Sequence, residues 1–395
     1  MKYVSKFLNH ACHFYENDEE IIIVDPWFSG EIFDKSWALL KEVEVEEEIN
    51  IQKIRHIFIS HEHPDHLHWA TLKFIRDASK GQISVYITSR HNKNIFNNLK
   101  NLGFDVHEII PMAREKLYDN FYYVQFPFGR DSALVFEVDG KTHLNQNDCY
   151  LDAHTCFLIN TLIPKVDYWW MQFSLAGYYA NHNNLEGLQE AKQYHLDMFT
   201  KYYNIFKPAT TIPFASYVYF CKKYNSYLNE WIVGLQEHID KNPDINFQIP
   251  FCGDVIGECD NNKSISRWEK LIRQKTKKES FNRQEDKEVV PEQLIIRLAD
   301  KWLKNVASNL PFEQIAVGFF EEEKRFVFDF KNKKSFFTTG DTHKNIVAKL
   351  TKEGLLCFVK FPWGADTLNI TACFEVINAV PWRFLLEYKD SDYDR

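Results

Sequence analysis

The chain has 395 residues, of which 45% are hydrophobic and 26% are charged. This is the composition of a globular protein, and it excludes wholesale disorder, a collagen-like fibre and a small disulfide scaffold. The formal net charge of −8 argues against an electrostatic grip on nucleic acid over the whole surface, so we expect no nucleic-acid partner.

Cysteine spacing and apolar runs bear on redox state and location. The eight cysteines form no C-x-x-C pair, so neither a zinc ribbon nor an iron–sulfur cluster is predicted. The first residues lead into no apolar segment of the signal-peptide type, and no run of about 18 apolar residues occurs. We therefore expect no signal peptide, no membrane span and a cytoplasmic protein with free thiols. A homo-oligomer stays open as an alternative to a monomer.

The N-terminal part alternates short β-branched runs with amphipathic segments. A typical buried strand covers residues 20–24 and ends where Pro26 stops the ladder. The strands expected after it cover 54–60, 83–87, 106–110, 121–126, 132–138 and 142–145, and the helices cover 67–79 and 94–102. Gly103 fits a helix end and Asp139-Gly140 a hairpin turn. This order predicts a layered α/β domain with mixed sheets.

The second half predicts more helix and then a change of character. Helices are expected within 183–206 and 227–237, a strand at 210–213, an exposed helix with a linker in 259–290, then a helix at 291–308 and strands at 315–319, 325–330, 355–360 and 368–371. We therefore predict a first domain over 1–258 and a small α+β domain over 291–395.

The most informative segment is a histidine cluster, His61-Glu62-His63-Pro64-Asp65-His66, directly after the strand at 54–60. Imidazole and carboxylate are the ligands that Zn, Mn and Fe use. Alternate residues of a tight loop share a side, so His61 and His63 can converge on one ion while Asp65 and His66 face a second position. The alternative is a solvated loop that is rich in histidine by chance. We favour the site for one or two divalent ions, because this spacing after a strand is rare.

This cluster resembles the metal signature of the metallo-β-lactamase fold superfamily. The resemblance implies an αββα sandwich with metal ligands on loops at one edge of the two sheets. It implies that Asp148 bridges two metals and that Asp65 accepts a proton or orients a water. It places Asp25 behind a cluster histidine, although a turn cap is as good an explanation. It places His10 near the site, whereas from the residues alone His10 and His13 occupy one predicted strand.

Other segments resemble a narrower branch, which contains the lactonase of ascorbate 6-phosphate and the C-terminal part of CMP-N-acetylneuraminate hydroxylase. This resemblance covers roughly residues 1–255. The segments are His10-Ala11-Cys12, Asp25-Pro26-Trp27-Phe28, Gly129-Arg130-Asp131-Ser132-Ala133, Asn147-Asp148-Cys149 and Pro213-Phe214-Ala215-Ser216. The Rieske cluster domain of the hydroxylase is not expected, since no Cys-x-His pair with a downstream partner pair occurs.

The chain departs from the superfamily pattern at two histidines. None occurs at 127–129, where the third motif falls, or at 213–215, where the last one falls. Four other histidines could substitute only if loops are rearranged: His107, His143, His182 and His195. A single ion, or two ions held partly by nonstandard groups, therefore fits equally well. His63 stands where flavodiiron members carry Glu, which favours Zn or Mn over Fe without excluding Fe.

Three residues beside these motifs are candidates for lesser roles. Arg130 can clamp a carboxylate or phosphate, although a surface ion pair is the commoner role of such an arginine. Asn147 is grouped with Arg130 as a residue that supports a ligand or contacts substrate. Cys149 is predicted to be a buried structural thiol. The C-terminal segment Phe361–Asp366 before the strand at 368–371 faintly resembles sterol-carrier-like modules.

Three functions follow from these observations. The first is a metal-dependent hydrolase that uses a metal-bound hydroxide on a small anionic substrate, such as a sugar phosphate, a lactone or a phosphodiester. A divalent ion suits this because it lowers the pKa of water from about 15.7 to about 7. The second is an iron-dependent oxygenase that acts on a nucleotide sugar or a similar small molecule. The third is a degenerate domain that binds without catalysis, which the two missing histidines motivate.

Overall fold

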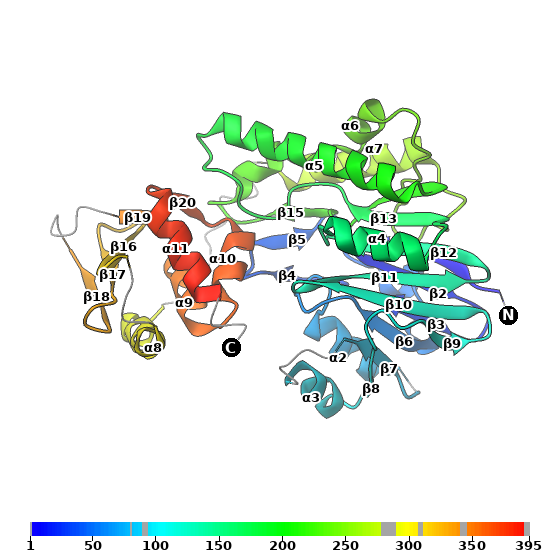
Figure 1. Cartoon of the computed structure of the whole chain (residues 1–395), viewed down its shortest axis with the longest axis horizontal. Coiled ribbons are helices and arrows are strands. Elements are labelled where there is room, and N and C mark those ends of the chain that lie inside the picture. Colours follow the sequence, from blue (N-terminus) through cyan, green and yellow to red (C-terminus); the bar gives the residue numbers. More distant parts are fainter. Residues whose placement is uncertain are drawn as a thin grey trace.

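The structure is a computed structural model that describes residues 2–79, 81–88, 94–277, 290–306, 311–339 and 346–390. Two six-stranded sheets lie face to face, with helices on the outer face of each (Figure 1). This is the αββα sandwich expected of the first domain. No helix in these ranges is both long and apolar enough to cross a membrane.

The first sheet joins the N-terminal hairpins to a parallel half. Its strands, in spatial order, are β1 (Val4–Asn9), β2 (Cys12–Glu16), β3 (Ile21–Val24), β6 (Ile54–Ile59), β7 (Ser84–Ile87) and β8 (Asp105–Glu108). Neighbours from β3 to β8 are parallel, as crossover helices require. These helices, α2 (Trp69–Ala78) and α3 (Asn94–Asn101), bury Leu72, Ile75 and Leu99 against the sheet. Gly103 follows α3 with a positive φ of 94°, as predicted.

The second sheet combines antiparallel hairpins with parallel strands. Its spatial order is β14 (Thr210–Phe214), β13 (Tyr168–Gln172), β12 (Lys141–Asn147), β11 (Asp131–Val138), β10 (Phe121–Phe128) and β9 (Glu115–Tyr118). Asp139 and Gly140 turn between β11 and β12 with φ of 50° and 76°, which confirms the predicted hairpin. Helices α4 (Ala153–Leu162) and α5 (Leu185–Phe206) cover the outer face (Figure 1).

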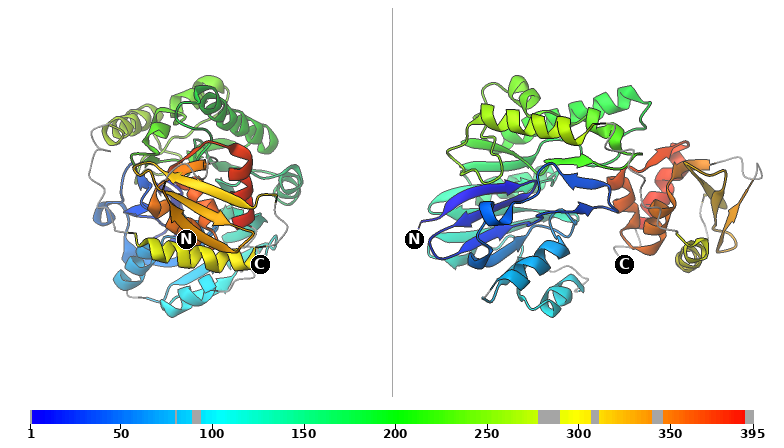
Figure 2. Two further views of the ribbon diagram at one scale, coloured as in Figure 1. Left: turned by 90° about the vertical axis from the view of Figure 1, so that its left-hand side faces the viewer. Right: turned by 180° about the vertical axis from the view of Figure 1, so that it is seen from behind.

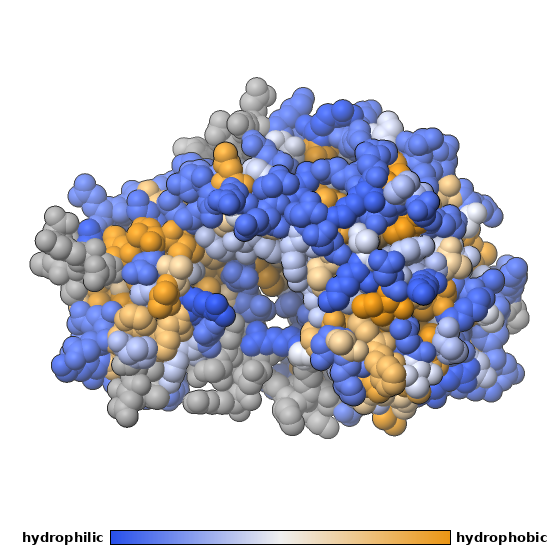
Figure 3. Space-filling model, turned by 45° about the horizontal axis from the view of Figure 1, so that its top comes forward, coloured by the Kyte–Doolittle hydropathy of each residue, from blue (hydrophilic) through white to orange (hydrophobic). Residues whose placement is uncertain are grey.

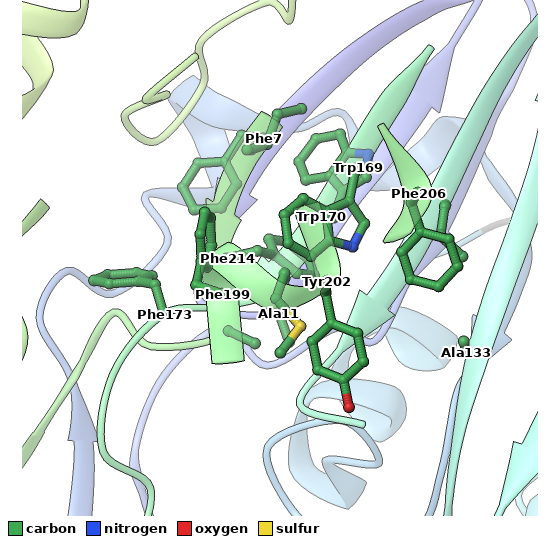
Figure 4. Close-up of a cluster of buried hydrophobic side chains, with 14 of the residues drawn as sticks. Phe7, Ala11, Ala133, Trp169, Trp170, Phe173, Phe199, Tyr202, Phe206 and Phe214 are labelled. Carbon is green, nitrogen blue, oxygen red and sulfur yellow. The ribbon is translucent and has the colours of Figure 1, made fainter. Parts of the chain in front are cut away.

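Aromatic side chains fill both sides of the second sheet (Figure 4). Trp169 packs outward on Phe199 of α5, with ring centroids 5.0 Å apart. Trp170 points between the sheets and stacks on His13 of β2 at 4.6 Å. Successive residues of β13 therefore pack on opposite faces of the sheet, one against α5 and one between the two sheets, because side chains alternate across a strand. His13 belongs to the core. The prediction that His10 and His13 lie on one strand is wrong, because His10 lies in the turn between β1 and β2.

Two elements of the later sandwich differ from the prediction. The helix expected at 227–237 is wrong: a short 3₁₀ helix, Ser226–Glu230, is followed by a break and by α6 (Leu235–Lys241). The break arises because the Asn229 side chain is engaged with the backbone of Phe220, and because Glu237 bonds back to the amide of Gly234 to begin α6. The smaller elements are α1 (Val45–Glu48), the 3₁₀ helix Ile51–Lys53, and a three-stranded sheet of β4 (Glu31–Ile32), β5 (Trp37–Leu39) and β15 (Val218–Phe220).

Helix α7 (Asn261–Lys275) lies in the segment predicted to be an exposed helix with a linker. The prediction that this helix is exposed is wrong, because one of its faces is buried. Trp268 is 1% exposed, and its Nε1 donates to the Pro250 carbonyl at 3.0 Å. Indole burial of this kind ties α7 to the sandwich core. Residues 278–289 of the predicted linker lie outside the described residues, so the predicted domain boundary stays a prediction.

The described residues from 290 onward, here called the C-terminal unit, form a second layered α+β fold. Helix α8 (Glu292–Asn305) precedes a five-stranded sheet of β18 (Lys334–Thr338), β17 (Arg325–Asp329), β16 (Gln314–Phe319), β19 (Ile346–Leu350) and β20 (Phe374–Val376). Its other helices are α9 (Lys352–Lys360), α10 (Gly364–Thr371) and α11 (Ala379–Asp390). Residues 307 and 308 of the helix predicted at 291–308 lie outside the described residues.

The strands predicted at 355–360 and 368–371 are wrong, because both segments are helical. Thr351 caps α9, its Oγ1 accepting from the Gly354 amide at 3.0 Å. Leu355, Phe358 and Val359 then lie on one buried helix face. The strand that contributed to the sterol-carrier-like resemblance is therefore part of α10.

The C-terminal unit is anchored to the sandwich through α10 and β20 (Figures 1 and 2). The Nε1 of Trp37 donates to the Ile370 carbonyl at 3.2 Å, and the Nδ2 of Asn225 donates to the Thr371 carbonyl at 2.9 Å. Asn181 bonds to both backbone groups of Val376. Figure 3 shows one face of the molecule hollowed between the two units. These contacts fix the orientation of α10 relative to the sandwich.

Gly364 allows α10 to lie directly against α9, and replacing it tests this packing. A Cβ at this position would lie 2.5 Å from the carbonyl oxygens of both Cys357 and Phe358, so the backbone would have to move. We expect Gly364→Ala to destabilise the protein by about 1–3 kcal/mol, as overpacking does. Urea denaturation measures this. Asn369→Ala, at an exposed position of the same helix, should change little; equal effects of both would contradict the packing argument.

Candidate metal centre

The ends of strands from both sheets bring polar side chains to one edge of the sandwich. Asp25 follows β3, the histidine cluster follows β6 and Asp148 follows β12. His10 lies in the β1–β2 turn and Asp131 begins β11. His10 and Asp25 have positive φ angles of 29° and 46°, backbone that side chains rarely adopt and that often marks a functional site.

Ser60 and Asp25 form the buried base of this site. The Ser60 amide donates to Asp25 Oδ1 at 2.7 Å and the Ser60 hydroxyl to Oδ2 at 2.6 Å. His66 Nδ1 donates to the same Oδ2 at 2.8 Å. The Ser60 carbonyl accepts from the side chains of Gln125 in β10 and Ser132 in β11. Burial raises the pKa of Asp25 even though these bonds oppose it, and the carboxyl fixes the ring of His66.

Hydrogen bonds on the far side of each ring determine which nitrogen faces the centre. Because His66 Nδ1 donates to Asp25, its Nε2 presents a lone pair. His61 Nδ1 lies 3.0 Å from the Ser60 hydroxyl, which leaves its Nε2 to face His63 Nδ1 at 2.9 Å. His63 Nε2 donates to Asp366 at 3.1 Å. In the neutral form of each ring, the nitrogens that face the same space are therefore Nε2 of His61, Nδ1 of His63 and Nε2 of His66.

Carboxylates join these nitrogens in two positions that share no residue. In the first, Asp131 Oδ1 lies 3.7 Å from His61 Nε2 and 3.9 Å from His63 Nδ1. In the second, Asp65 Oδ2 lies 3.1 Å from His10 Nε2 and 3.4 Å from His66 Nε2. The ligand atoms within each trio lie within 4.8 Å of one another.

Asp148 lies between the two positions. Its Oδ2 is 3.6 Å from His61 Nε2 and 3.5 Å from His66 Nε2. Asn147 holds this turn, because its Nδ2 donates to the Ser132 carbonyl at 2.8 Å while its Oδ1 accepts from the Asp148 amide at 2.8 Å.

Buried polar atoms without hydrogen-bond partners test whether these residues fit a cation. Among the described residues, four such atoms belong to side chains of this centre: Asp65 Oδ1, His66 Nε2, Asp131 Oδ1 and Asp148 Oδ1. Buried groups left unsatisfied are costly, and a set of acceptors gathered in one place is what a positive ion requires. Imidazole and carboxylate suit Zn, Mn and Fe, so this cluster could hold a metal ion.

The electrostatics of the cluster agree with a role in cation binding. Burial, then the charge of Asp148, raises the pKa of Asp131 to about 7. Burial lowers the pKa of His61 well below its usual value, so this ring is neutral. Burial also lowers the pKa of His63, but the hydrogen bond to Asp366 and the charges of the nearby carboxylates together outweigh it and raise the pKa to about 9. A cation at the centre favours the deprotonated form of each group.

The structure brings together the residues singled out in the sequence and adds two more. The side chains that converge are those of His61, His63, Asp65, His66 and Asp148, with Asp25, His10 and Asn147 around them. Arg130 lies beside them, with Nη1 3.7 Å from Asp366 Oδ2.

Asp131 and Asp366 were missed as site residues. The sequence offered a local indication that Asp131 belongs to the site, since this residue closely follows the segment where a third histidine was expected. Asp366 had none, because 303 positions separate it from His63.

The four substitute histidines proposed from the sequence lie elsewhere. His107 is exposed on β8, and His143 stacks on Tyr168 in the core. His182 lies near Tyr227, and His195 lies between the hydroxyls of two tyrosines, each 2.7 Å from one of its ring nitrogens. The Ala215 amide donates to the His10 carbonyl at 2.9 Å, so His10 lies beside the segment where the last histidine was expected. Cys149 is buried, as predicted.

Comparison with known proteins identifies the first part of the chain. Residues 5–147 match the family described as a β-lactamase superfamily domain. This part of the chain is a metallo-β-lactamase superfamily domain. The match contains the histidine cluster, Asp25 and Asp131, and it ends next to Asp148.

Curated proteins similar to this metallo-β-lactamase domain include hydroxylases. The cytidine monophosphate-N-acetylneuraminic acid hydroxylase of Danio rerio is 26% identical over 150 residues, which cover 36% of this chain and 25% of that protein. The same enzyme of Cricetulus griseus is 29% identical over 150 residues, which cover 36% and 26%. The aligned segment thus spans about a quarter of these relatives.

Two solved structures are similar to parts of this chain. CmlA, a diiron β-hydroxylase from Streptomyces venezuelae, has a TM-score of 0.41 and 16% identity, covering 54% of this chain and 45% of that one. Igni18, a metallo hydrolase from Ignicoccus hospitalis, has a TM-score of 0.39 and 16% identity, covering 65% and 98%.

Replacing Asp25 tests its part in the metallo-β-lactamase domain. We expect Asp25→Asn to weaken divalent-metal binding by about 10–100-fold, because the amide cannot accept from Ser60 and His66 together as the carboxylate does. Competition with a chromophoric chelator measures this affinity. Asp18→Asn, at an exposed turn, is the matched control. Equal affinities of the two variants would show that Asp25 only closes the turn.

Proposed function

We propose that the protein is a metal-dependent hydrolase with a centre for two divalent ions. The observation that carries this proposal is the position of Asp148, whose carboxylate faces one histidine of each trio. A single shared carboxylate between two ligand sets is suited to holding two ions close together.

The ligand sets follow from the contacts described above. His61, His63 and Asp131 would hold the first ion; the second would be held by His10, Asp65 and His66. Asp131 and His10 would then stand in for the two histidines that the sequence lacks, which removes the motive for a degenerate domain. When bound, such ions act as Lewis acids and lower the pKa of water.

The chain's own residues would provide proton transfer and substrate attraction. The neighbouring His66 and His10 lower the pKa of Asp65 well below its usual value although burial opposes this, so the carboxylate is ionised and can orient a water. Arg130 lies beside the centre, and its guanidinium can attract the carboxylate or phosphate of a small anionic substrate. This supports a sugar phosphate, a lactone or a phosphodiester as substrate.

Elemental analysis and a substrate panel test the hydrolase. We expect about two equivalents of Zn or Mn in protein purified without added metal, and metal-dependent hydrolysis of bis(p-nitrophenyl) phosphate or a phosphorylated lactone. Arg130→Gln should raise KM for anionic substrates more than it lowers kcat. Bound metal without hydrolysis of any anionic substrate would count against this function.

An iron-dependent oxygenase is the second candidate, and one observation favours it. Each trio consists of two histidines and one aspartate, which is the ligand set of non-haem iron oxygenases. The curated relatives named above, of which about a quarter aligns with this chain, are hydroxylases. Stoichiometric iron with oxygen consumption would support this candidate over hydrolysis.

A further inference from the structure

We infer that Asp366, in the C-terminal unit, is a positioning residue for the metal ligand His63, so that the C-terminal unit completes the metal centre. This inference rests on the proposed function, because it requires that His63 bind a metal. It concerns a residue far outside the segment matched by the superfamily, which ends at residue 147.

The contact is specific on both sides. His63 Nε2 lies 3.1 Å from Asp366 Oδ2, and the two side chains are only 20% and 29% exposed. Because the Asp366 carboxylate can only accept, His63 Nε2 carries a proton and donates it, which leaves Nδ1 as the nitrogen that faces His61 Nε2 at 2.9 Å. Arg130 Nη1 lies 3.7 Å from the same carboxylate oxygen.

A carboxylate in this place determines how well His63 binds a metal. A ligating histidine that donates its other N–H to a carboxylate is held in one tautomer and one orientation, and its lone pair becomes more basic. Asp25 does the same for His66 from within the sandwich. The two histidines are therefore held alike, but one of the two carboxylates comes from the second unit.

The position of Asp366 is fixed by the packing of α10. Gly364 begins this helix against the carbonyls of α9, where no side chain fits. At the other end, the carbonyls of Ile370 and Thr371 accept hydrogen bonds from Trp37 and Asn225 of the sandwich. Asp366 therefore reaches His63 from a helix that is held at both ends.

Metal titrations of the full chain test the inference. We expect Asp366→Ala to weaken Zn²⁺ binding by about 10–100-fold and to change the visible d–d absorption of the Co²⁺-loaded protein, because the His63 ring loses its orientation. Asp366→Asn keeps an oxygen that accepts from Nε2, so it should restore most of the affinity and the spectrum. Tyr224→Phe removes a different contact between the units, the 2.8 Å bond from Tyr224 to Glu321, and should change neither.

The outcomes separate this inference from the proposed function. If the wild-type chain binds neither Zn²⁺ nor Co²⁺, the proposed function and the inference both fail. If the wild type binds and Asp366→Ala binds equally well, only the inference fails. Equal weakening by Asp366→Ala and Tyr224→Phe would overturn it too, since the effect would then be general loosening of the interface. Loss of one metal equivalent without recovery in Asp366→Asn would make Asp366 a ligand and overturn the positioning role.

Discussion

Replacing His61 and His66 together by alanine should abolish tight metal binding and any metal-dependent activity. Each proposed position loses a nitrogen, and Asp148 loses both of the rings that face it. At free metal about 1,000-fold above Kd, binding stabilises the native state by about 4 kcal/mol, so wild-type Tm should rise by several degrees with Zn²⁺. The double variant should show no such rise. Thermal melts with and without Zn²⁺, together with elemental analysis, measure both effects.

The control for this prediction is His107→Ala, at an exposed histidine on β8. It should retain the metal content and the Zn²⁺-induced rise in Tm of the wild type. If the His61→Ala/His66→Ala variant keeps the same rise as this control, these histidines are not metal ligands. The function proposed for the cluster would then have to be abandoned.

Trp170→Ala should be among the most destabilising single changes in the sandwich. The side chain is fully buried, stacks on His13 at 4.6 Å and contacts Phe214 edge-on at 5.1 Å (Figure 4). Its Nε1 has no hydrogen-bond partner among the described residues, so the loss is one of packing. We expect the free energy of unfolding to fall by about 3–5 kcal/mol. Urea denaturation measures this change.

Trp363→Ala provides the comparison, because that indole is 43% exposed. It should lower the free energy of unfolding by much less than Trp170→Ala. A loss below about 1 kcal/mol for Trp170→Ala would contradict this prediction. It would mean that the sheets move together to fill the space left by the ring, which a tightly packed interior does not allow.

The sandwich was predictable because its signals are local. The apolar runs of β3 and β6, the amphipathic spacing of α2 and the Asp139-Gly140 turn each specify one element. The strand prediction from the apolar run at 355–359 failed because local sequence does not decide there. A short, continuous apolar segment fits a strand or a buried helix equally well. The cap at Thr351 decides for helix, and it lies outside the run. Burial of Trp268 likewise depends on a distant partner, the Pro250 carbonyl.

The residues of the candidate site likewise differ in whether a local sequence pattern predicts them. The histidine cluster is contiguous, so spacing alone marked it as a group of ligands. His10 and Asp131 reach it only because the sheets bring the β1–β2 turn and the start of β11 to the same edge. Asp366 depends on the docking of a second unit, which no local pattern contains.

Ser60 joins the metal centre to both layers of the sandwich. Its side chain bonds to Asp25, while its carbonyl accepts from Gln125 and Ser132 in the opposite sheet. The spacing of the ligands is therefore inherited from the distance and angle between the sheets. A substitution deep in the interior that shifts one sheet by a few tenths of an ångström would therefore change the size of ion that the candidate centre can hold. During evolution, drift in the hydrophobic interior could thus change the metal preference of the candidate centre before any of its side chains is replaced.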